Sequence, residues 1–226
     1  MTIQAGEYKS RVGLDNLYYA LVTTDSAATY AVGSTTYLAP AAAATQAPST
    51  NIETQYADDQ PYDVITSEGA TEIVLTVTGI PLETLAAITG KVYDTVNGRM
   101  YDTTGTPPYC ALGFRALKSD GSYRYYWFLK GMFTMPDENL ETKGETPTPQ
   151  TQEITYSAIQ TVHKFNTGGA NSYSVKRVTG DTSITAFSAT TWFDAVQTPD
   201  SVTIISSSVS PSVSASVSPS ASTSPS

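Results

Sequence analysis

A core can form only from the first 200 residues of this chain, because the last 26 contain almost nothing to bury. Ser201–Ser226 carries no charge, and half of it is serine. It also repeats itself, since Val209–Ser216 (VSPSVSAS) and Val217–Ser224 (VSPSASTS) agree at six of eight positions. Such a segment has too little apolar bulk to fold alone. We therefore predict a folded domain over residues 1–200 and a low-complexity, Ser-rich extension over residues 201–226.

The size and composition of the first 200 residues favour a single β domain. β-Sandwiches and barrels often reach this length without splitting into two domains. Charged residues make up 15% of the chain, against roughly 25% in typical globular proteins, and 15 residues are tyrosine. This combination suits wide sheets whose outer faces contact other protein.

The chain is acidic, with a net charge of −9 and a pI near 4.4. Nucleic-acid binding needs Lys and Arg to neutralise phosphates, so this charge argues against it. The first residues, MTIQAGEYKSR, lack the apolar run of a signal peptide. No stretch approaches the roughly 20 apolar residues that a membrane helix requires. We expect a chain made in a cytoplasm, without membrane insertion.

A first strand at Leu17–Thr23 is followed by a long, almost uncharged stretch. In Thr24–Thr50 the only charged residue is Asp25, and Tyr30–Leu38 could form a short β excursion within it. A compact domain rarely carries so long a connection without using it. We predict that residues 24–50 form a long arm that contacts a neighbouring subunit.

A strand and a short helix are predicted next. Glu72–Thr78 (EIVLTVT) alternates apolar and polar residues with the period of a half-buried strand. In Ile80–Gly90 (IPLETLAAITG), Pro81 suits a first helical turn and Gly90 suits a C-terminal stop. The apolar side of this helix is predicted to contain Leu82, Leu85, Ala86 and Ile88.

Hairpins and a late strand follow. Asn97-Gly98, between Val92–Val96 and Arg99–Thr103, predicts a type I′ turn. Ser119-Asp120-Gly121 predicts a tight turn between the strands Tyr109–Leu117 and Tyr123–Phe133. Alternation returns at Glu153–Val162, and Ala189–Val196 is predicted to be a short helix. The domain is therefore predicted to be mostly antiparallel β with little helix.

Tyr123–Phe133 (YRYYWFLKGMF) carries aromatic residues on both faces. One face is predicted to be core, and it contains Tyr123, Tyr125, Trp127 and Leu129. The other is predicted to contact another subunit, and it contains Arg124, Tyr126, Phe128 and Lys130.

No constellation of residues supports catalysis. His163 is the only histidine and Cys110 the only cysteine, which argues against a catalytic triad and a transition-metal site. We predict that Cys110 is a buried small hydrophobe and His163 a surface or interface residue. Asp58-Asp59 could be a carboxylate pair or a calcium site, but strand neighbours point to opposite faces, so a turn or subunit contact is favoured. No phosphate or dinucleotide fingerprint occurs, and we predict a non-enzyme without cofactor or metal.

The order of several segments resembles the major tail proteins of long-tailed bacteriophages, the subunits of the tail tube. The resemblance covers roughly residues 10–165. It rests on Gly13–Leu21 (GLDNLYYAL), Gln55–Asp59 (QYADD), Leu82–Gly90 (LETLAAITG), Pro108–Phe133, and Glu141–Glu153 leading into Ile154–Val162.

The resemblance implies a structural virion protein, assembled in the host cytoplasm. Its subunits would form hexameric rings that stack into a hollow tube, with tape-measure, terminator and distal tail proteins at the tube ends. DNA would pass through the lumen without specific binding, and the extension would lie outside. The expected fold is an antiparallel β-sandwich or half-barrel with one short flanking α-helix.

We predict subunit contacts at eight residues and keep one alternative function open. The alternative is a β-sandwich module on a Ser-rich linker that binds carbohydrate or a cell surface, with Tyr and Trp as a sugar platform. Core and interface packing is the favoured role of these aromatics. The predicted contact residues are Tyr30, Tyr37, Leu38, Tyr56, Asp58, Asp59, Tyr126 and Phe128.

Overall fold

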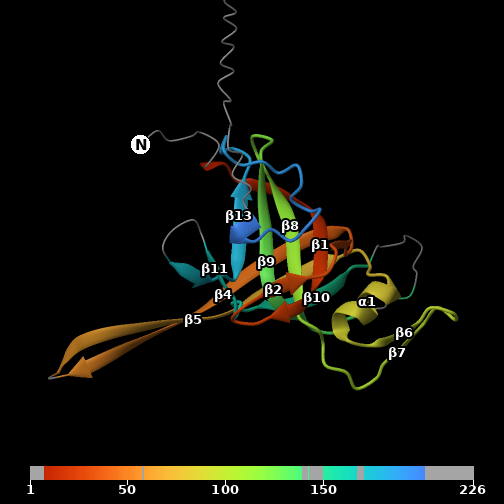
Figure 1. The fold of residues 1–226 in the computed structure, drawn as a ribbon, viewed down its shortest axis with the longest axis horizontal. Helices are drawn as coiled ribbons and strands as arrows, with labels where there is room; N and C mark the ends of the chain where they lie inside the picture. The colour runs from red at the N-terminus through yellow and green to blue at the C-terminus, as the bar shows by residue number, and fades with distance from the viewer. Residues whose placement is uncertain (1–7, 58, 139–141, 143–149, 167–170, 202–226) are drawn as a thin grey trace, which may run out of the picture.

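Most of the chain lies in one antiparallel sheet of nine strands (Figure 1). The computed structural model describes residues 8–57, 59–138, 142, 150–166 and 171–201. The strands pair in the order β2-β1-β8-β9-β10-β5-β4, while β13 also pairs with β9 and β3 with β1. The nine strands are β1 (Arg11–Asp25), β2 (Tyr30–Val32), β3 (Thr36–Tyr37), β4 (Ala41–Ala57), β5 (Gln60–Val77), β8 (Cys110–Lys118), β9 (Tyr123–Phe133), β10 (Gln152–Ala158) and β13 (Arg177–Asp181).

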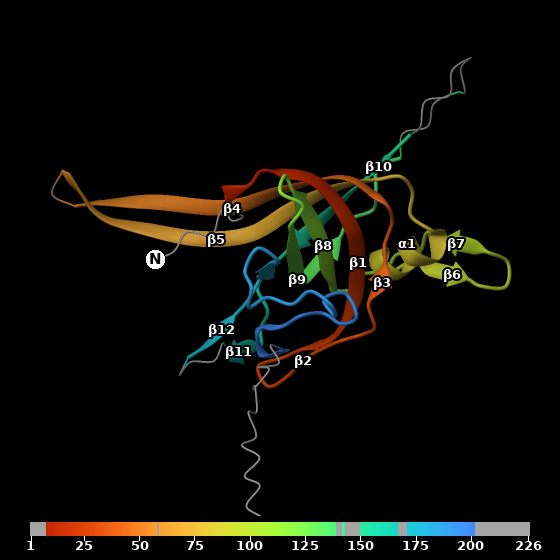
Figure 2. The same cartoon turned by 90° about the horizontal axis from the view of Figure 1, so that it is seen from above.

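Strand β9 divides this sheet into two layers. Its residues Arg124–Phe128 pair with β13, and its last residues, Gly131–Phe133, pair with β10. The layer β10–β5–β4 therefore leaves β9 at one end and passes over the layer β2–β1–β8–β9–β13 (Figure 2). The sheet stays open, and the predicted fold class, a mainly antiparallel β-sandwich or half-barrel, is confirmed.

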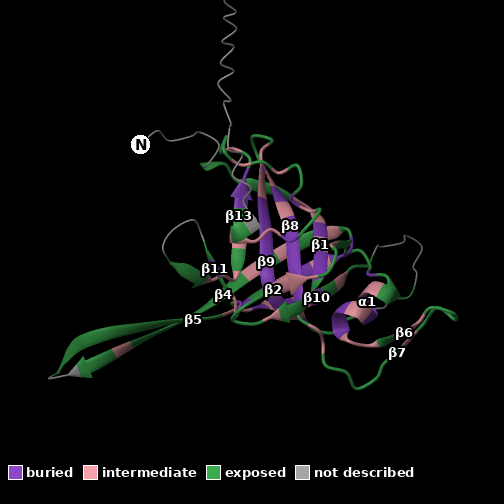
Figure 3. Ribbon diagram, viewed as in Figure 1, coloured by how far each residue is buried: buried purple, intermediate pink, exposed green. Residues whose placement is uncertain are grey.

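The main core lies between the two layers. Ile73, Leu75 and Val77 of β5 are completely buried, which confirms the alternation predicted for this strand. They pack with inward residues of the other layer such as Leu112 and Phe114. Figure 3 shows this buried material in the body, on β8, β9 and β1 above all.

A second core covers the opposite face of β8 and β9. Residues 182–198 run across that face, and Trp192 and Val196 pack there against Trp127 and Leu129. The Trp127 Nε1–H donates a hydrogen bond to the carbonyl oxygen of Trp192 at 2.9 Å. Both faces of β9 are therefore buried within the chain, so the predicted core role of its Trp127 face is confirmed.

The helix predicted at Ala189–Val196 is wrong. This segment forms successive turns, in which the N–H of Trp192 bonds to Ala189 and that of Asp194 to Thr191. Eight residues with two adjacent threonines gain little from helix formation in isolation. Here the segment follows the aromatic face of the sheet instead.

The other predicted helix is α1 (Leu82–Thr89), which ends at Gly90 in the left-handed region, with φ 71°. Leu85 and Ile88 are buried as predicted, but Leu82 is 48% exposed and does not belong to the apolar side. In the described residues, no helix is long or apolar enough to cross a membrane.

The hairpin predicted around Asn97-Gly98 exists, but its turn is not type I′. Strands β6 (Val92–Asp94) and β7 (Arg99–Tyr101) are joined by four residues, and only Gly98 among them has a positive φ. The Asp94 carboxylate accepts hydrogen bonds from the N–H groups of Val96 and Asn97 and thereby closes the longer loop. A further hairpin is formed by β11 (Lys164–Asn166) and β12 (Ser172–Ser174), and a 3-10 turn, η2, spans Pro199–Ser201.

Residues 24–50 do not form a long connection, which corrects the predicted arm. Strands β2 and β3 pair with β1, and β4 pairs along β5 from Ala41 onward. The small residues of Ala41–Ala47 form an edge strand of the sheet, which satisfies their backbone groups on one side. The segment that leaves the body is a different one, the outer part of the β4–β5 hairpin.

Two buried ion pairs join strands within the layer β2–β1–β8–β9–β13. Lys118 and Asp181, 1% and 7% exposed at their side chains, are joined at 2.6 Å, and Arg124 also bonds to Asp181. Lys130 bonds to Asp25 at 2.7 Å, and Asp25 accepts the backbone N–H groups that follow β10. Removing one partner of either pair would leave the other partner as a buried charge without a counter-charge.

These pairs make the stability of the fold dependent on pH. Burial raises the pKa of Asp181, but hydrogen bonds from Lys118, Ser183 and Arg124 outweigh it and bring the pKa below the ordinary 3.8. The pKa of Asp25 is lowered in the same way by Lys130 and two backbone N–H groups. Their stabilisation is complete above the ordinary carboxyl pKa and is lost as pH falls toward the lower folded-state values.

We therefore expect the free energy of unfolding to decrease as pH is lowered from about 5 to 2. Asp181→Asn should cost about 3–5 kcal/mol at pH 7 and flatten this pH dependence, because Lys118 loses its partner. Urea unfolding across the pH range measures both. Asp102→Asn, in the exposed pair with Lys91, is the control and should keep the wild-type profile. An Asp181→Asn profile as steep as that of the wild type would contradict the assignment.

The second core gives a separate test. Trp127 is fully buried, so Trp127→Ala should cost about 3–5 kcal/mol and lower the melting temperature. Tyr62→Ala, at a 79% exposed side chain, should stay within about 0.5 kcal/mol of the wild type. Thermal unfolding of both variants compares them directly. An unchanged melting temperature for Trp127→Ala would show that the Trp127 face is not a core.

Candidate assembly site

A two-stranded ribbon projects from the body of the protein. It is the outer part of the β4–β5 hairpin, residues 48–57 and 59–70, and Figures 1 and 2 show it extending away from all other strands. Nearly all of its described residues are exposed (Figure 3). An isolated pair of strands is marginally stable in water. A ribbon of this length therefore suits a segment that packs against another molecule.

The ribbon has one apolar and one polar face. Residues paired across antiparallel strands share a face, and the pairs Ile52–Thr66 and Thr54–Val64 lie on one side. The pairs Glu53–Ile65 and Gln55–Asp63 lie on the other. The large apolar residues Ile52, Tyr56 and Val64, all more than half exposed, belong by this alternation to the first face. Tyr62, 79% exposed, is the extra residue of β5 at a register shift and adjoins Pro61, the partner of Tyr56.

The apolar face continues the inner face of the body. Pro48 of β4 pairs with Thr71 of β5, and Thr50 pairs with Glu68. Two steps along β4 therefore correspond to three steps along β5. The extra residue is a bulge in β5. Because β4 has no extra residue there, its even-numbered positions stay on the core side from Ala44 through Ile52 to Tyr56. The ribbon thus carries the inner face of the half-barrel out into solvent.

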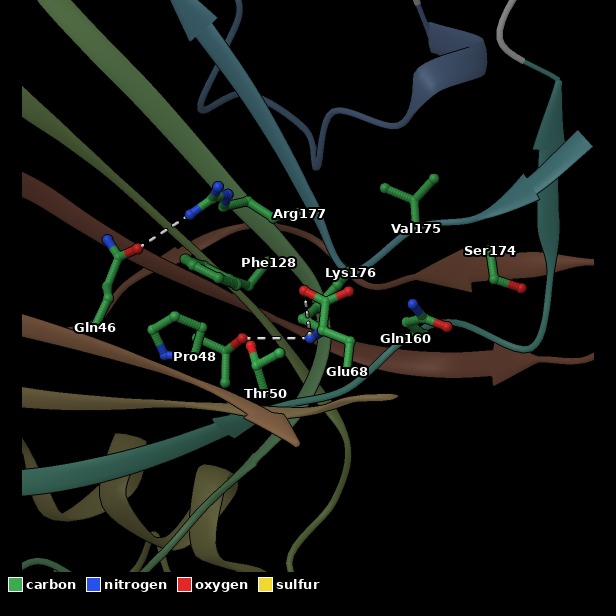
Figure 4. A pocket seen from close by; sticks show the side chains of 11 residues that line it. Gln46, Pro48, Thr50, Glu68, Phe128, Gln160, Ser174, Val175, Lys176 and Arg177 are labelled. Atoms are coloured by element: carbon green, nitrogen blue, oxygen red, sulfur yellow. Dashed lines mark hydrogen bonds and ion pairs between the residues drawn. The ribbon is translucent and has the colours of Figure 1, made fainter. Parts of the chain in front are cut away.

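A groove of about 570 Å³ lies at the root of the ribbon (Figure 4). It runs between β4–β5 and the segment leading into β13, and Phe128 lies at its centre in Figure 4. Lys176 Nζ donates to the carbonyl of Gly69 at 2.8 Å and pairs with Glu68 at 3.5 Å, while Arg177 bonds to Gln46 at 3.2 Å. These contacts fix the direction in which the ribbon leaves the body.

Four of the eight predicted contact residues are instead part of this chain's own cores. Leu38, Tyr126 and Phe128 are 1–3% exposed in the main core. Tyr30 is half-buried against the second core, and its hydroxyl donates to the carbonyl of Leu129. For Tyr126 and Phe128 the prediction failed because both faces of β9 are covered from within the chain, which leaves no face of that strand for a neighbour. Leu38 and Tyr30 lie outside β9 and pack into the main core and against the second core, respectively.

The other predicted contact residues remain candidates. Tyr37 is 45% exposed on β3, and Tyr56 is 71% exposed on the apolar face of the ribbon. Asp59 lies in the turn that joins β4 to β5, with φ 57°. Asp58 lies outside the described residues.

Sequence reasoning missed the rest of the apolar face, above all Val64, and the adjoining Tyr62. Their signal was present: Gln60–Glu68 (QPYDVITSE) alternates and contains β-branched residues after an Asp-Asp turn. The alternation predicts a strand. It cannot tell that the first part of this strand lies outside the core while its continuation, Thr71–Val77, lies within it.

The remaining candidates for chemistry have structural roles. Cys110 is fully buried, which confirms the prediction, and burial raises the pKa of its thiol to about 12. His163 is half-buried with its ring edge-on to Phe165. The residues that the structure describes contain no group of three His, Cys, Asp or Glu side chains able to hold a metal ion. The two tryptophans are 0% and 6% exposed, so neither can form a sugar platform.

A body whose two cores are covered by the chain itself, with a projecting unpartnered ribbon, has the form of a structural subunit that joins to other molecules. Residues 25–198 match the family model of the phage tail tube protein. The match covers most of the chain, and the chain therefore belongs to the phage tail tube protein family. A search of curated proteins found no match. The protein is a structural component of the bacteriophage virion.

Proposed function

We propose that this protein polymerises head to tail through its ribbon into hexameric rings, which stack into a tail tube that conducts DNA. The observation that carries the proposal is the apolar face of the ribbon, which continues the inner face of the body and has no cover in the single chain. A ribbon that points away from its own body can contact only another molecule, and in a polymer of one subunit that molecule is another copy. Such a heterologous contact generates closed rings or helical filaments.

The apolar face can supply the binding energy. Fully burying one side chain of the size of Ile, Val or Tyr contributes about 1.5–3 kcal/mol. The face offers Ile52, Tyr56 and Val64, and Tyr62 adjoins it, so burial can exceed the cost of ordering and association. A ribbon of about ten residues per strand also reaches about 30 Å, enough to span the joint between two subunits.

The outer face of β10–β5–β4 is the surface best suited to face DNA. Nine residues in register form its centre: Ala43, Thr45 and Ala47 on β4, Glu72, Val74 and Thr76 on β5, and Glu153, Thr155 and Ser157 on β10. They include two carboxylates and neither Lys nor Arg. Without cations a surface cannot release counterions from DNA, so a polyanion would slide past it.

The proposal includes further partners in the virion. The ends of the tube would contact tape-measure, terminator and distal tail proteins, and assembly would take place in the host cytoplasm. Membership of the tail tube family supports these statements.

The two faces of the ribbon allow a matched test of assembly. Val64 and Ile65 are adjacent, 54% and 55% exposed, and lie on opposite faces. Val64→Asp should prevent tube formation, because it places a charge in the buried contact, while Ile65→Asp should be tolerated on the acidic face. Electron microscopy of the purified full-length variants measures tubes, and thermal unfolding should give equal melting temperatures. Normal tubes from Val64→Asp would refute the role of the apolar face.

Truncation after Asp200 tests the place of the extension. It removes residues 201–226 but keeps the segment 182–198 that covers the second core. We expect tubes of unchanged bore and diameter, with material lost from the outer surface only, in a cryo-EM map. The same map should place the β10–β5–β4 face on the bore. A bore lined by Lys and Arg, or failure of the truncated chain to assemble, would contradict the respective half of this expectation.

A further inference from the structure

The positive charges of this protein are distributed unevenly along the chain and in the fold. No Lys, Arg or His occurs between Arg11 and Lys91, a span that includes the whole ribbon. The ribbon itself carries Glu53, Asp59, Asp63 and Glu68 among its described residues. Of these, Glu68 is paired with Lys176 of the same chain. Glu53 and Asp63 lie on the polar face of the ribbon by the strand register, so that face is acidic. Within the span from residue 12 to residue 90 no copy of the chain offers it a cation.

Most cations of the body are already neutralised. Among the described residues, six form ion pairs: Lys91, Arg115, Lys118, Arg124, Lys130 and Lys176. Arg11 and Arg177 are exposed and have no carboxylate at ion-pair distance in the described part of the chain. Arg177 bonds only to the neutral amide of Gln46. Arg99 of the β6–β7 hairpin also forms no ion pair in the described residues, so three guanidinium groups are left without a counter-charge. Only Arg11 and Arg177 among them lie against an aromatic ring.

These two arginines lie against one side chain. The guanidinium carbons of Arg11 and Arg177 are each 5.9 Å from the centre of the Tyr126 ring. Arg177 is also 5.8 Å from the Phe128 ring, at the groove at the root of the ribbon. Aromatic faces hold guanidinium groups in place. Two like charges therefore border one ring, from β1 on one side of β9 and from β13 on the other. A carboxylate brought to each of them would stabilise this arrangement.

We propose that this arginine pair, Arg11 and Arg177, is the receiving site for the acidic face of the ribbon of a second copy. The inference rests on the proposed assembly and names the surface that the ribbon contacts. Glu53 and Asp63, neighbours on the polar face, are the carboxylates that bind. Arginine binds carboxylates through paired N–H donors. Each ribbon then ends at the root of the next ribbon, which makes the contact directional and repeatable.

A charge-reversal experiment on full-length protein tests the site. One variant carries Arg11→Glu and Arg177→Glu, and the other carries Glu53→Lys and Asp63→Lys. Each alone should require at least tenfold more protein than the wild type to form tubes, as measured by sedimentation and electron microscopy. An equimolar mixture should assemble again, because each ribbon then meets an opposite charge on the other variant. Wild-type assembly should also weaken as NaCl is raised.

Controls separate this proposal from folding and from the proposed function. Lys164→Glu, at an exposed lysine without an ion pair in the described residues, should assemble like the wild type. If the Arg→Glu variant loses its melting transition, Arg11→Gln with Arg177→Gln replaces it, with the same tenfold expectation.

The outcomes are distinguishable. Tubes from both reversed variants at the wild-type concentration, or a mixture that fails to recover, would overturn the arginine site and leave the tube intact. Wild-type protein that never assembles would overturn the proposed function as well. Binding of duplex DNA that the Arg→Glu variant loses, while its tubes form normally, would assign the arginines to nucleic acid and overturn the site.

Discussion

Burial of β9 on both faces is the condition on which the rest of the structure depends. This strand pairs with β8 along one edge and, along the other, with β13 and then β10. Tyr126 and Phe128 enter the core between the layers, while Trp127 and Leu129 enter the core under residues 182–198. One strand thus joins two layers and two cores. Loss of the β10–β5–β4 layer or of residues 182–198 would expose a row of aromatic side chains of β9. It would also remove support from the core on the opposite face of this strand.

The ribbon follows from the way in which the second layer is attached. Only three residues of β9 pair with β10, and seven residues of β5 continue from there along β10. Beyond Thr71, β5 keeps β4 as its sole described partner, so the hairpin outgrows the body. The bulge at this point and the bonds of Lys176 fix its direction. The fold therefore places apolar residues outside its own core, where the described part of the chain leaves them exposed.

The sequence predicted the local elements well and the use of their faces less well. The strand Glu72–Thr78, the helix ending at Gly90 and the hairpin at Asn97-Gly98 all have short-range signals, namely alternation and turn residues. For β9, period-2 alternation separates two faces but cannot say which is covered by the same chain. Tyr126 and Phe128 were assigned to a neighbour because residues 182–198, distant in sequence and without regular structure, gave no sign that they cover the Trp127 face. The ribbon was missed for the converse reason: its alternation resembles that of a core strand.

The distribution of charge explains how a body this acidic can fold and still assemble. Within the layers, a carboxylate is paired with one cation or with two, as Asp181 is with Lys118 and Arg124. Such pairing consumes cations, of which the chain has 12 against 21 acidic residues. Part of the excess acid lies on the ribbon and on the outer face of β10–β5–β4, where like charges repel. Contacts between copies cannot then rely on general attraction, because acidic surfaces keep copies apart. In the assembly that we propose, apolar burial supplies the affinity, and the unpaired arginines decide only where and in which direction a copy binds.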